Sequence, residues 1–205
     1  MISPDYAARQ IGGALKMALG AKDWRASLGR ATDDVFAAFA AFAICAPLVI
    51  LATFAAKRAA LRIPELGDTL VRSAPLAALI LGDLVTFALD VAASLALLVM
   101  LARATGVGKQ AAELIIGYAW IQPVLVAAQL PAIALMASTA SRTAGALLAL
   151  PALILTVALI FGIVRRGLDA RPAPAAAIVA MLIVAGAVID IFVSAGLRAL
   201  FAPQS

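Results

Sequence analysis

The sequence predicts an all-α, multi-pass membrane protein, in which a bundle of five transmembrane helices follows an amphipathic helix at the N-terminus. Hydrophobic residues make up 65% of the 205 residues and charged residues only 13%, whereas soluble domains carry about 45–50% and about 25% respectively. The apolar residues are also gathered into long runs. A soluble protein would have to expose many of these side chains to water and would aggregate. A lipid bilayer is therefore the expected solvent.

Residues 1–34 form the first predicted unit, a cytoplasmic segment with one interfacial helix. Ser3 can cap this helix, Pro4 fits its first turn, and Gly20 can end it. One side of the helical wheel is apolar and carries Ala8, Ile11, Leu15, Ala18 and Leu19. The charged residues Asp5, Arg9 and Lys16 lie opposite, as in helices that rest among lipid headgroups. Gly12 and Gly13 favour the alternative, a frayed tail, which stays open.

Residues 35–205 form the second predicted unit, a membrane domain with five apolar runs. Each run reaches the length of about 20 predominantly apolar residues that a bilayer requires. The runs cover residues 35 to 56, 74 to 101, 111 to 137, 144 to 164 and 174 to 200. Thr32, Asp33 and Asp34 favour a helix start before the first run. Lys57 and Arg58 follow it where a signal peptide would have small residues, so we expect this run to be retained.

The basic residues predict the orientation of the bundle. Ten of the 16 Lys and Arg residues lie on the side of the N-terminus and six on the opposite side of the five spans. Because cytoplasmic loops carry an excess of Lys and Arg, we expect a cytoplasmic N-terminus and an outside C-terminus. These residues lie beside apolar runs, without interleaved aromatic residues, so they indicate topology and not nucleic-acid binding.

Several kinds of chemistry are disfavoured by the residues present. Cys45 is the single cysteine, and the chain has no histidine. The sequence shows no nucleophile with a base beside it and no cluster of metal ligands on either membrane face. We therefore expect a protein that is not an enzyme and that has neither a cofactor nor a metal.

The second run contains a polar stripe, within the stretch "LGDLVTFALDVAAS" (residues 81–94). In an α-helix Asp83 and Asp90 lie on one face, about 10 Å apart along the axis. Thr86 falls between them and Ser94 one turn beyond. A charged group in a membrane span costs roughly 2.5–3.5 kcal/mol on insertion scales, unless it finds a partner or water. The stripe is therefore expected to face protein or a cavity.

The third run carries Gln122 and Gln129 at the same spacing of seven residues. If the second and third spans are antiparallel, the depths along each helix predict two contacts, Asp83 with Gln129 and Asp90 with Gln122. Asp190 adds a third acid near the middle of the fifth span. Two interpretations remain open: polar contacts that join helices, or a path for protons or cations. Convergence of the three acids on one cavity would favour the path.

The stretch "TGVGKQAAELIIGYAWIQPVLVAAQLPAIALMA" (residues 105–137) resembles the Yip family, named for proteins that interact with Ypt and Rab GTPases, and in particular its bacterial branch. Tyr118, Trp120, Gln122, Pro123 and Gln129 carry the similarity. The resemblance implies a five-span membrane protein without catalytic residues. The N-terminal segment lacks the acidic, tyrosine and glycine motif of eukaryotic members, so binding of a Rab-type partner is not implied.

Two functions follow as expectations. The first is a scaffold or membrane-organising protein of the bacterial inner membrane, as the resemblance implies, whose partners are the lipid bilayer and either a second copy or another membrane protein. The second is a small transporter or channel subunit that moves protons or cations along Asp83, Asp90 and Asp190.

Overall fold

The computed structural model describes residues 3–29, 31–63, 69–106 and 111–201, and these residues are helical apart from short connections. The helices are α1 (Pro4–Leu19), α2 (Trp24–Ser27), α3 (Thr32–Ala38), α4 (Ala40–Arg62), α5 (Thr69–Ser73), α6 (Leu76–Ala104), α7 (Ala111–Thr139), α8 (Arg142–Gly167) and α9 (Pro172–Phe201). The described residues contain no strand. The predicted all-α class is therefore confirmed.

Five helices are long and apolar enough to cross a membrane, as predicted. α3 and α4 together make the first, Asp33–Arg62, with a break at Phe39. Span ends lie within three residues of the predicted ones, except that the first span continues from residue 56 to Arg62. The added turns carry Lys57 and Arg58. Charged residues are compatible with a helix end that continues beyond the hydrocarbon into the polar layer of the membrane. The protein is a multi-pass membrane protein.

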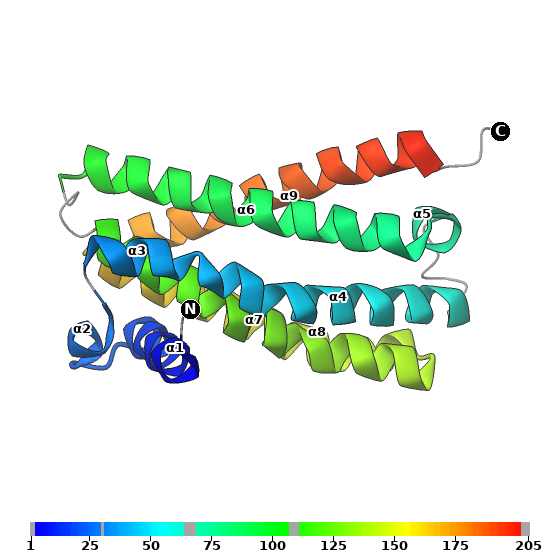
Figure 1. Cartoon of the computed structure of the whole chain (residues 1–205), viewed down its shortest axis with the longest axis horizontal. Coiled ribbons are helices and arrows are strands. Elements are labelled where there is room, and N and C mark those ends of the chain that lie inside the picture. Colours follow the sequence, from blue (N-terminus) through cyan, green and yellow to red (C-terminus); the bar gives the residue numbers. More distant parts are fainter. Residues whose placement is uncertain (1–2, 30, 64–68, 107–110, 202–205) are drawn as a thin grey trace.

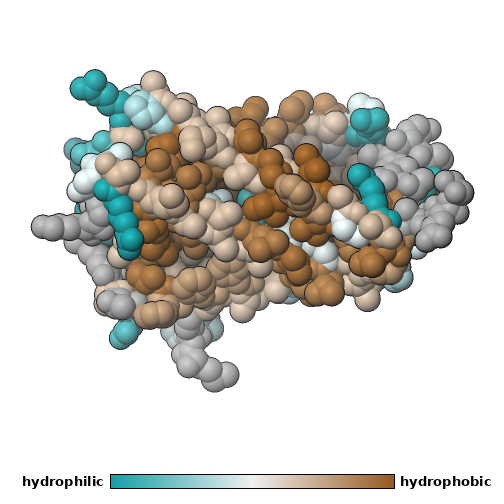
Figure 2. Space-filling model, turned by 90° about the horizontal axis from the view of Figure 1, so that it is seen from above, coloured by the Kyte–Doolittle hydropathy of each residue, from teal (hydrophilic) through white to brown (hydrophobic). Residues whose placement is uncertain are grey.

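The five spans form a ring in the order α4, α6, α9, α8, α7, in which each neighbouring pair is in contact and α6 also contacts α7. Successive spans run in opposite directions, so the connections between them lie alternately at the two ends of the ring (Figure 1). We call them the α1 end, where α1 and α2 lie, and the α5 end, where α5 and the C-terminal end of α9 lie. Exposed apolar residues cover the middle of the molecule, and hydrophilic residues gather toward the two ends (Figure 2).

The main hydrophobic core occupies the half of the ring near the α1 end. It contains the second half of α6, the first half of α7, the last turns of α8 and the first turns of α9. The largest fully buried side chains there include Trp120, Leu98, Leu114 and Ile163. A smaller cluster at the α5 end contains Leu70, Ala74 and Leu79. The bundle is therefore packed more completely in one half than in the other.

The predicted N-terminal helix is present with its predicted ends. The Ser3 side chain accepts a hydrogen bond from the Tyr6 amide, Pro4 is in the first turn, and Gly20 ends the helix with φ 83°. One face of α1 is buried against α7 and α8 and carries Gln10, Gly13, Ala14, Met17 and Ala18. Leu19, on the predicted apolar side, is 72% exposed. The helix thus docks onto protein with one face, Ile11 and Leu15 of the predicted apolar side pack against the core, and Leu19 stays exposed.

Basic side chains satisfy carbonyl groups at several helix ends. Arg62 donates to the carbonyl oxygens of Ala137 and Ser138 at the end of α7, at 2.9 and 3.2 Å. Arg72 donates to Ala60 and Ile63 at the end of α4, at 3.0 and 3.2 Å. The last carbonyl groups of a helix have no partner within the helix, and cations there also favour the helix dipole. Residues that indicated topology in the sequence therefore also cap helices.

Candidate intramembrane polar cavity

A cavity of about 440 Å³ lies inside the ring of five spans and receives residues from all of them. Its polar lining consists of Thr53 from α4, Asp83, Thr86 and Asp90 from α6, Tyr118, Gln122 and Gln129 from α7, and Thr156 from α8. Gly186 of α9 and several aliphatic side chains complete the wall. The polar stripes of the second and third spans therefore face the same space, as the heptad spacing in each had indicated.

Two of the predicted intramembrane polar residues, Ser94 and Asp190, lie outside this lining. Ser94 is only 1% exposed, and its hydroxyl has no hydrogen-bond partner within the described residues. It lies beside Tyr118 in the packed half of the bundle. Asp190 is on the exposed side of α9, within electrostatic range of Asp83 but not on the cavity wall. Two of the three predicted acids therefore converge on the cavity.

Asp83 has a different partner from the predicted one. Its Oδ2 atom accepts a hydrogen bond from the Thr53 hydroxyl, with an oxygen–oxygen distance of 2.5 Å. In the described part of the chain, hydrogen bonds join neither Asp83 to Gln129 nor Asp90 to Gln122. The helical period placed these side chains on the face of α6 that lines the cavity, but α6 contacts α4 as well as α7, and the partner of Asp83 comes from α4. Gln129 of α7 lines the same cavity without a hydrogen bond to Asp83.

The Thr53 hydroxyl can serve Asp83 in both of its protonation states. Thr53 is 4% exposed, and its oxygen lies 3.0 Å from the Val49 carbonyl as well as 2.5 Å from Asp83. A hydroxyl carries one proton, so it can donate to only one of these acceptors at a time. It donates to an ionised Asp83, whereas a protonated Asp83 can donate to Thr53 while Thr53 donates to Val49. Asp83 can therefore gain or lose a proton while it stays hydrogen-bonded to Thr53.

Asp90 lies against the backbone of α9 at Gly186. A Cβ atom added to Gly186 would be only 2.7 Å from Oδ1 of Asp90, which is closer than nonbonded atoms approach. The absence of a side chain at residue 186 thus makes room for the carboxylate of Asp90. The Tyr118 side chain is also close to Asp90, and Gln122 is close to Tyr118. These residues form the deeper end of the cavity.

Exposure of the polar side chains increases along the cavity. Tyr118 is 3% exposed and Gln122 is 8% exposed, whereas Gln129 and Asp83 are exposed and Asp90 is intermediate. Gln129 and Asp83 are nearer to the α5 end of their helices than Gln122 and Asp90 are. The more exposed polar residues therefore lie at the end of the cavity nearer to α5, which we call its mouth, and the hydrophobic core adjoins the opposite end, its floor.

The residues that carry the family resemblance divide between the core and the cavity. Trp120 is fully buried and contacts the Tyr6 ring of α1 edge-on, with 6.0 Å between ring centroids. Tyr118 and Gln122 are buried at the cavity floor, Pro123 is buried in the same helix, and Gln129 is near the mouth. Residues 107–110 of the glycine and basic loop lie outside the described residues. The residues of the motif thus lie on two faces of α7. Trp120 contacts α1, and Tyr118, Gln122 and Gln129 line the cavity.

Sequence reasoning missed the contributions of Thr53 and Thr156. Each is an isolated hydroxyl-bearing residue within a long apolar run, and each faces the cavity. Thr156 also has a buried hydroxyl oxygen without a hydrogen-bond partner in the described residues. A buried, unpaired hydroxyl beside a polar cavity is the usual place for a bound water. An isolated threonine in a span was the available signal, although threonine often satisfies a carbonyl of its own helix.

The arrangement favours positively charged ligands. The wall contains two carboxylates together with hydroxyl and amide groups, and no Lys or Arg belongs to the lining. The described residues contain no group of three carboxylate or thiolate ligands that could hold a metal ion.

Comparisons with protein-family models, with curated proteins and with solved structures find no match to this chain.

Proposed function

We propose that this protein is a small membrane transport protein or channel subunit in which Asp83 and Asp90 bind a proton or a small cation. The observation that carries the proposal is that both acids line one cavity, instead of each packing against an amide on a neighbouring helix. A carboxylate placed in hydrocarbon is costly, so acids in spans usually line ion or proton paths. Water in an open cavity would lower that cost.

The charge of the lining decides the class of ligand. Two carboxylates in a space without basic residues make the potential negative, which favours cations over anions. The hydroxyl of Thr53 and the amides of Gln122 and Gln129 supply neutral oxygen atoms of the kind that coordinate small cations. Because Thr53 can pair with Asp83 in either protonation state, a proton is the simplest ligand.

We propose in addition that the protein lies in a bacterial inner membrane with the α1 end in the cytoplasm and the α5 end outside. The excess of Lys and Arg at the α1 end supports this orientation. The cavity would then open to the outside and be closed toward the cytoplasm. Passage of an ion would require the packed half of the bundle to open transiently.

The second candidate is a scaffold of the Yip type, with a second copy or another membrane protein as its partner. The burial of Tyr118, Trp120 and Pro123 favours it, because most of the family-like residues then serve packing. In this alternative the polar residues of the cavity only hold the helices together. Measured contributions of such contacts average about 0.6 kcal/mol each.

Proton and cation flux into proteoliposomes separates the two candidates. We expect the wild type to exceed empty liposomes, and Asp83→Asn and Asp90→Asn to abolish most of that flux. Asp190→Asn should retain more activity, because Asp190 is not on the cavity wall. Asp5→Asn, at an exposed residue of α1, is the control that removes an acid elsewhere.

A steric pair of variants tests the same site without changing charge. Gly186→Ala would push against Asp90, whereas Gly196→Ala on the same helix meets nothing within 4 Å. We expect only Gly186→Ala to reduce flux. Wild-type flux no greater than that of empty liposomes, with the protein folded, would overturn the transport proposal and favour the scaffold.

A further inference from the structure

A second polar cavity, of about 350 Å³, lies at the α1 end and is separate from the intramembrane one. Its lining consists of Trp24 and Arg25 of α2, Arg165 and Arg166 of α8, and Asp169 and Ala170, which follow α8. Arg165 and Arg166 stand where the fourth apolar span ends. The cavity is therefore at the depth of the lipid headgroups.

Positive charge exceeds negative charge in this cavity. Three guanidinium groups line it with one carboxylate, that of Asp169. Glu113 of α7 lies 3.4 Å from Nε of Arg25 and offsets part of that charge. Arg165 is exposed, and no carboxylate pairs with it in the part of the chain that the structure describes. Arg165 and Arg166 are adjacent in the sequence and both line the cavity, so an anion held between them would be stabilised.

Two of the three arginines that line the cavity are held in place by contacts of their own. Nη1 of Arg166 donates to the carbonyl oxygens of Met17 and Ala18 at 2.9 and 2.7 Å. The Arg25 guanidinium lies over the Trp24 ring, 4.7 Å from its centroid.

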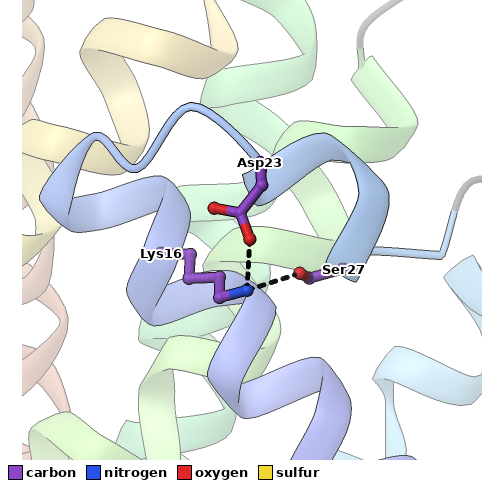
Figure 3. A network of polar contacts seen from close by, with 3 residues as sticks. All are labelled: Lys16, Asp23 and Ser27. Carbon is purple, nitrogen blue, oxygen red and sulfur yellow. Dashed lines mark hydrogen bonds and ion pairs between the residues drawn. The ribbon is translucent and has the colours of Figure 1, made fainter.

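A polar network fixes the short helix that carries Trp24 and Arg25 (Figure 3). Nζ of Lys16 in α1 lies 2.5 Å from Asp23 and 3.2 Å from the Ser27 hydroxyl, at the two ends of α2. Because Arg25 and Arg166 are already positioned, the cavity loses less side-chain entropy when it binds an anion.

We infer that this cavity binds the phosphodiester of an anionic phospholipid headgroup. Guanidinium groups match the oxygens of phosphate in geometry and charge, and basic pockets between spans are known to hold lipid headgroups. A lipid is favoured over free phosphate because Leu19, 72% exposed, precedes Gly20, where an added Cβ atom would overlap the Arg166 guanidinium. The acyl chains would thus have apolar surface beside the charged site.

Asp169 indicates which headgroup fits. A carboxylate opposes a second negative charge but accepts hydrogen bonds from hydroxyl groups. A headgroup with one phosphate and free hydroxyls, as in phosphatidylglycerol, satisfies both the arginines and Asp169. Asp169 has φ 47°, a conformation that asparagine adopts as readily as aspartate. Asp169→Asn therefore removes the charge while preserving the turn.

The experiment follows the thermal midpoint of the full-length protein in phosphatidylcholine and detergent micelles during titration with phosphatidylglycerol. A ligand that binds only the folded state raises the midpoint. We expect Arg165→Gln to require about fivefold more phosphatidylglycerol for the same rise, which corresponds to one basic residue near a membrane surface. Asp169→Asn should require less than the wild type. Arg171→Gln, an exposed arginine at the same end but outside the cavity, should behave as the wild type.

Two results would overturn the inference. Equal responses of Arg165→Gln and Arg171→Gln would mean that phosphatidylglycerol acts through the general positive charge of this end. A full response to inorganic phosphate, with no further rise on adding the lipid, would assign the cavity to free phosphate. A lipid response that Arg165→Gln weakens and Asp169→Asn strengthens would support the headgroup site.

Discussion

At the residue scale, the contact between Thr53 and Asp83 is the feature of the cavity that is most open to a direct test. Thr53→Val keeps the shape of the side chain and removes its hydroxyl, so Asp83 loses its partner. We expect the free energy of unfolding in detergent to fall by about 0.6 kcal/mol, because exposure of Asp83 to cavity water limits the loss. Proton flux should fall as well.

Thr53→Ser is the matched control, since it keeps a hydroxyl that can reach both Val49 and Asp83. It should preserve flux even if it lowers stability slightly. Equal loss of flux in the valine and serine variants would show that the methyl group of Thr53 matters and not its hydrogen bond.

The Tyr6 hydroxyl of α1 makes the stability of the folded protein depend on pH. Its hydroxyl donates to Asp34 at 2.7 Å, and burial, followed by this hydrogen bond and the charge of Asp34, raises the pKa of Tyr6 from 10.0 to about 12. The folded state thus favours the neutral phenol. Its contribution to stability is complete below pH 10 and is lost as the pH rises through about 12.

Thermal midpoints of the wild type and Tyr6→Phe, measured from pH 8 to 12, test this linkage. The phenylalanine variant keeps the ring and has no proton to lose. We expect a constant difference in midpoint below pH 10, which shrinks or reverses above it. A difference that stays constant up to pH 12 would contradict the assignment.

At the element scale, the close approach of α1 to α8 depends on Gly162. A Cβ atom at this residue would overlap the Ala18 carbonyl oxygen, which also accepts a hydrogen bond from Arg166. Gly162→Ala should therefore displace the end of α1, at a cost of about 1–3 kcal/mol, which is typical of overpacking. Limited proteolysis of the N-terminal segment should become faster.

Gly12→Ala is the control for that substitution. A Cβ atom there meets nothing within 4 Å, and alanine is favoured over glycine inside a helix by about 1 kcal/mol. We expect it to slow proteolysis of the same segment. If both alanine variants behaved alike, α1 would not be held by the contact at Gly162.

The sequence predicted single elements better than their neighbours. Apolar length and the pattern of Ser3, Pro4 and Gly20 predicted the spans and the N-terminal helix, because these signals are local. The spacing of Asp83 and Asp90 predicted a polar face for the same reason. The partner of Asp83 was predicted wrongly from the antiparallel order of α6 and α7. α6 contacts both α4 and α7. Which of the two supplies the partner of Asp83 depends on packing among all five spans, and helical periodicity carries no information on that packing.

At the scale of the whole molecule, the two halves of the bundle differ in what fills them. Aliphatic and aromatic side chains fill the half near α1, and polar groups line a cavity that extends from the level of Tyr118 toward α5. α1 and its contacts with Arg166 add further packing to the closed half. A route through the protein would therefore be limited at the level of Tyr118 and Gln122, where exposure of the cavity residues is lowest.

This asymmetry predicts that a reagent in solution reaches two glutamine positions of α7, Gln122 and Gln129, at different rates. In sealed vesicles, a membrane-impermeant thiol reagent applied at the α5 side should label Gln129→Cys, near the cavity mouth, much faster than Gln122→Cys, at its floor. The wild type gives the background, because Cys45 is fully buried. A small permeant reagent, used as a control, should narrow the difference between the two variants. If Gln122→Cys reacted as fast as Gln129→Cys from the α5 side, the cavity would extend past its expected floor. Faster labelling of Gln122→Cys from the α1 side would place the opening at the other end of the bundle.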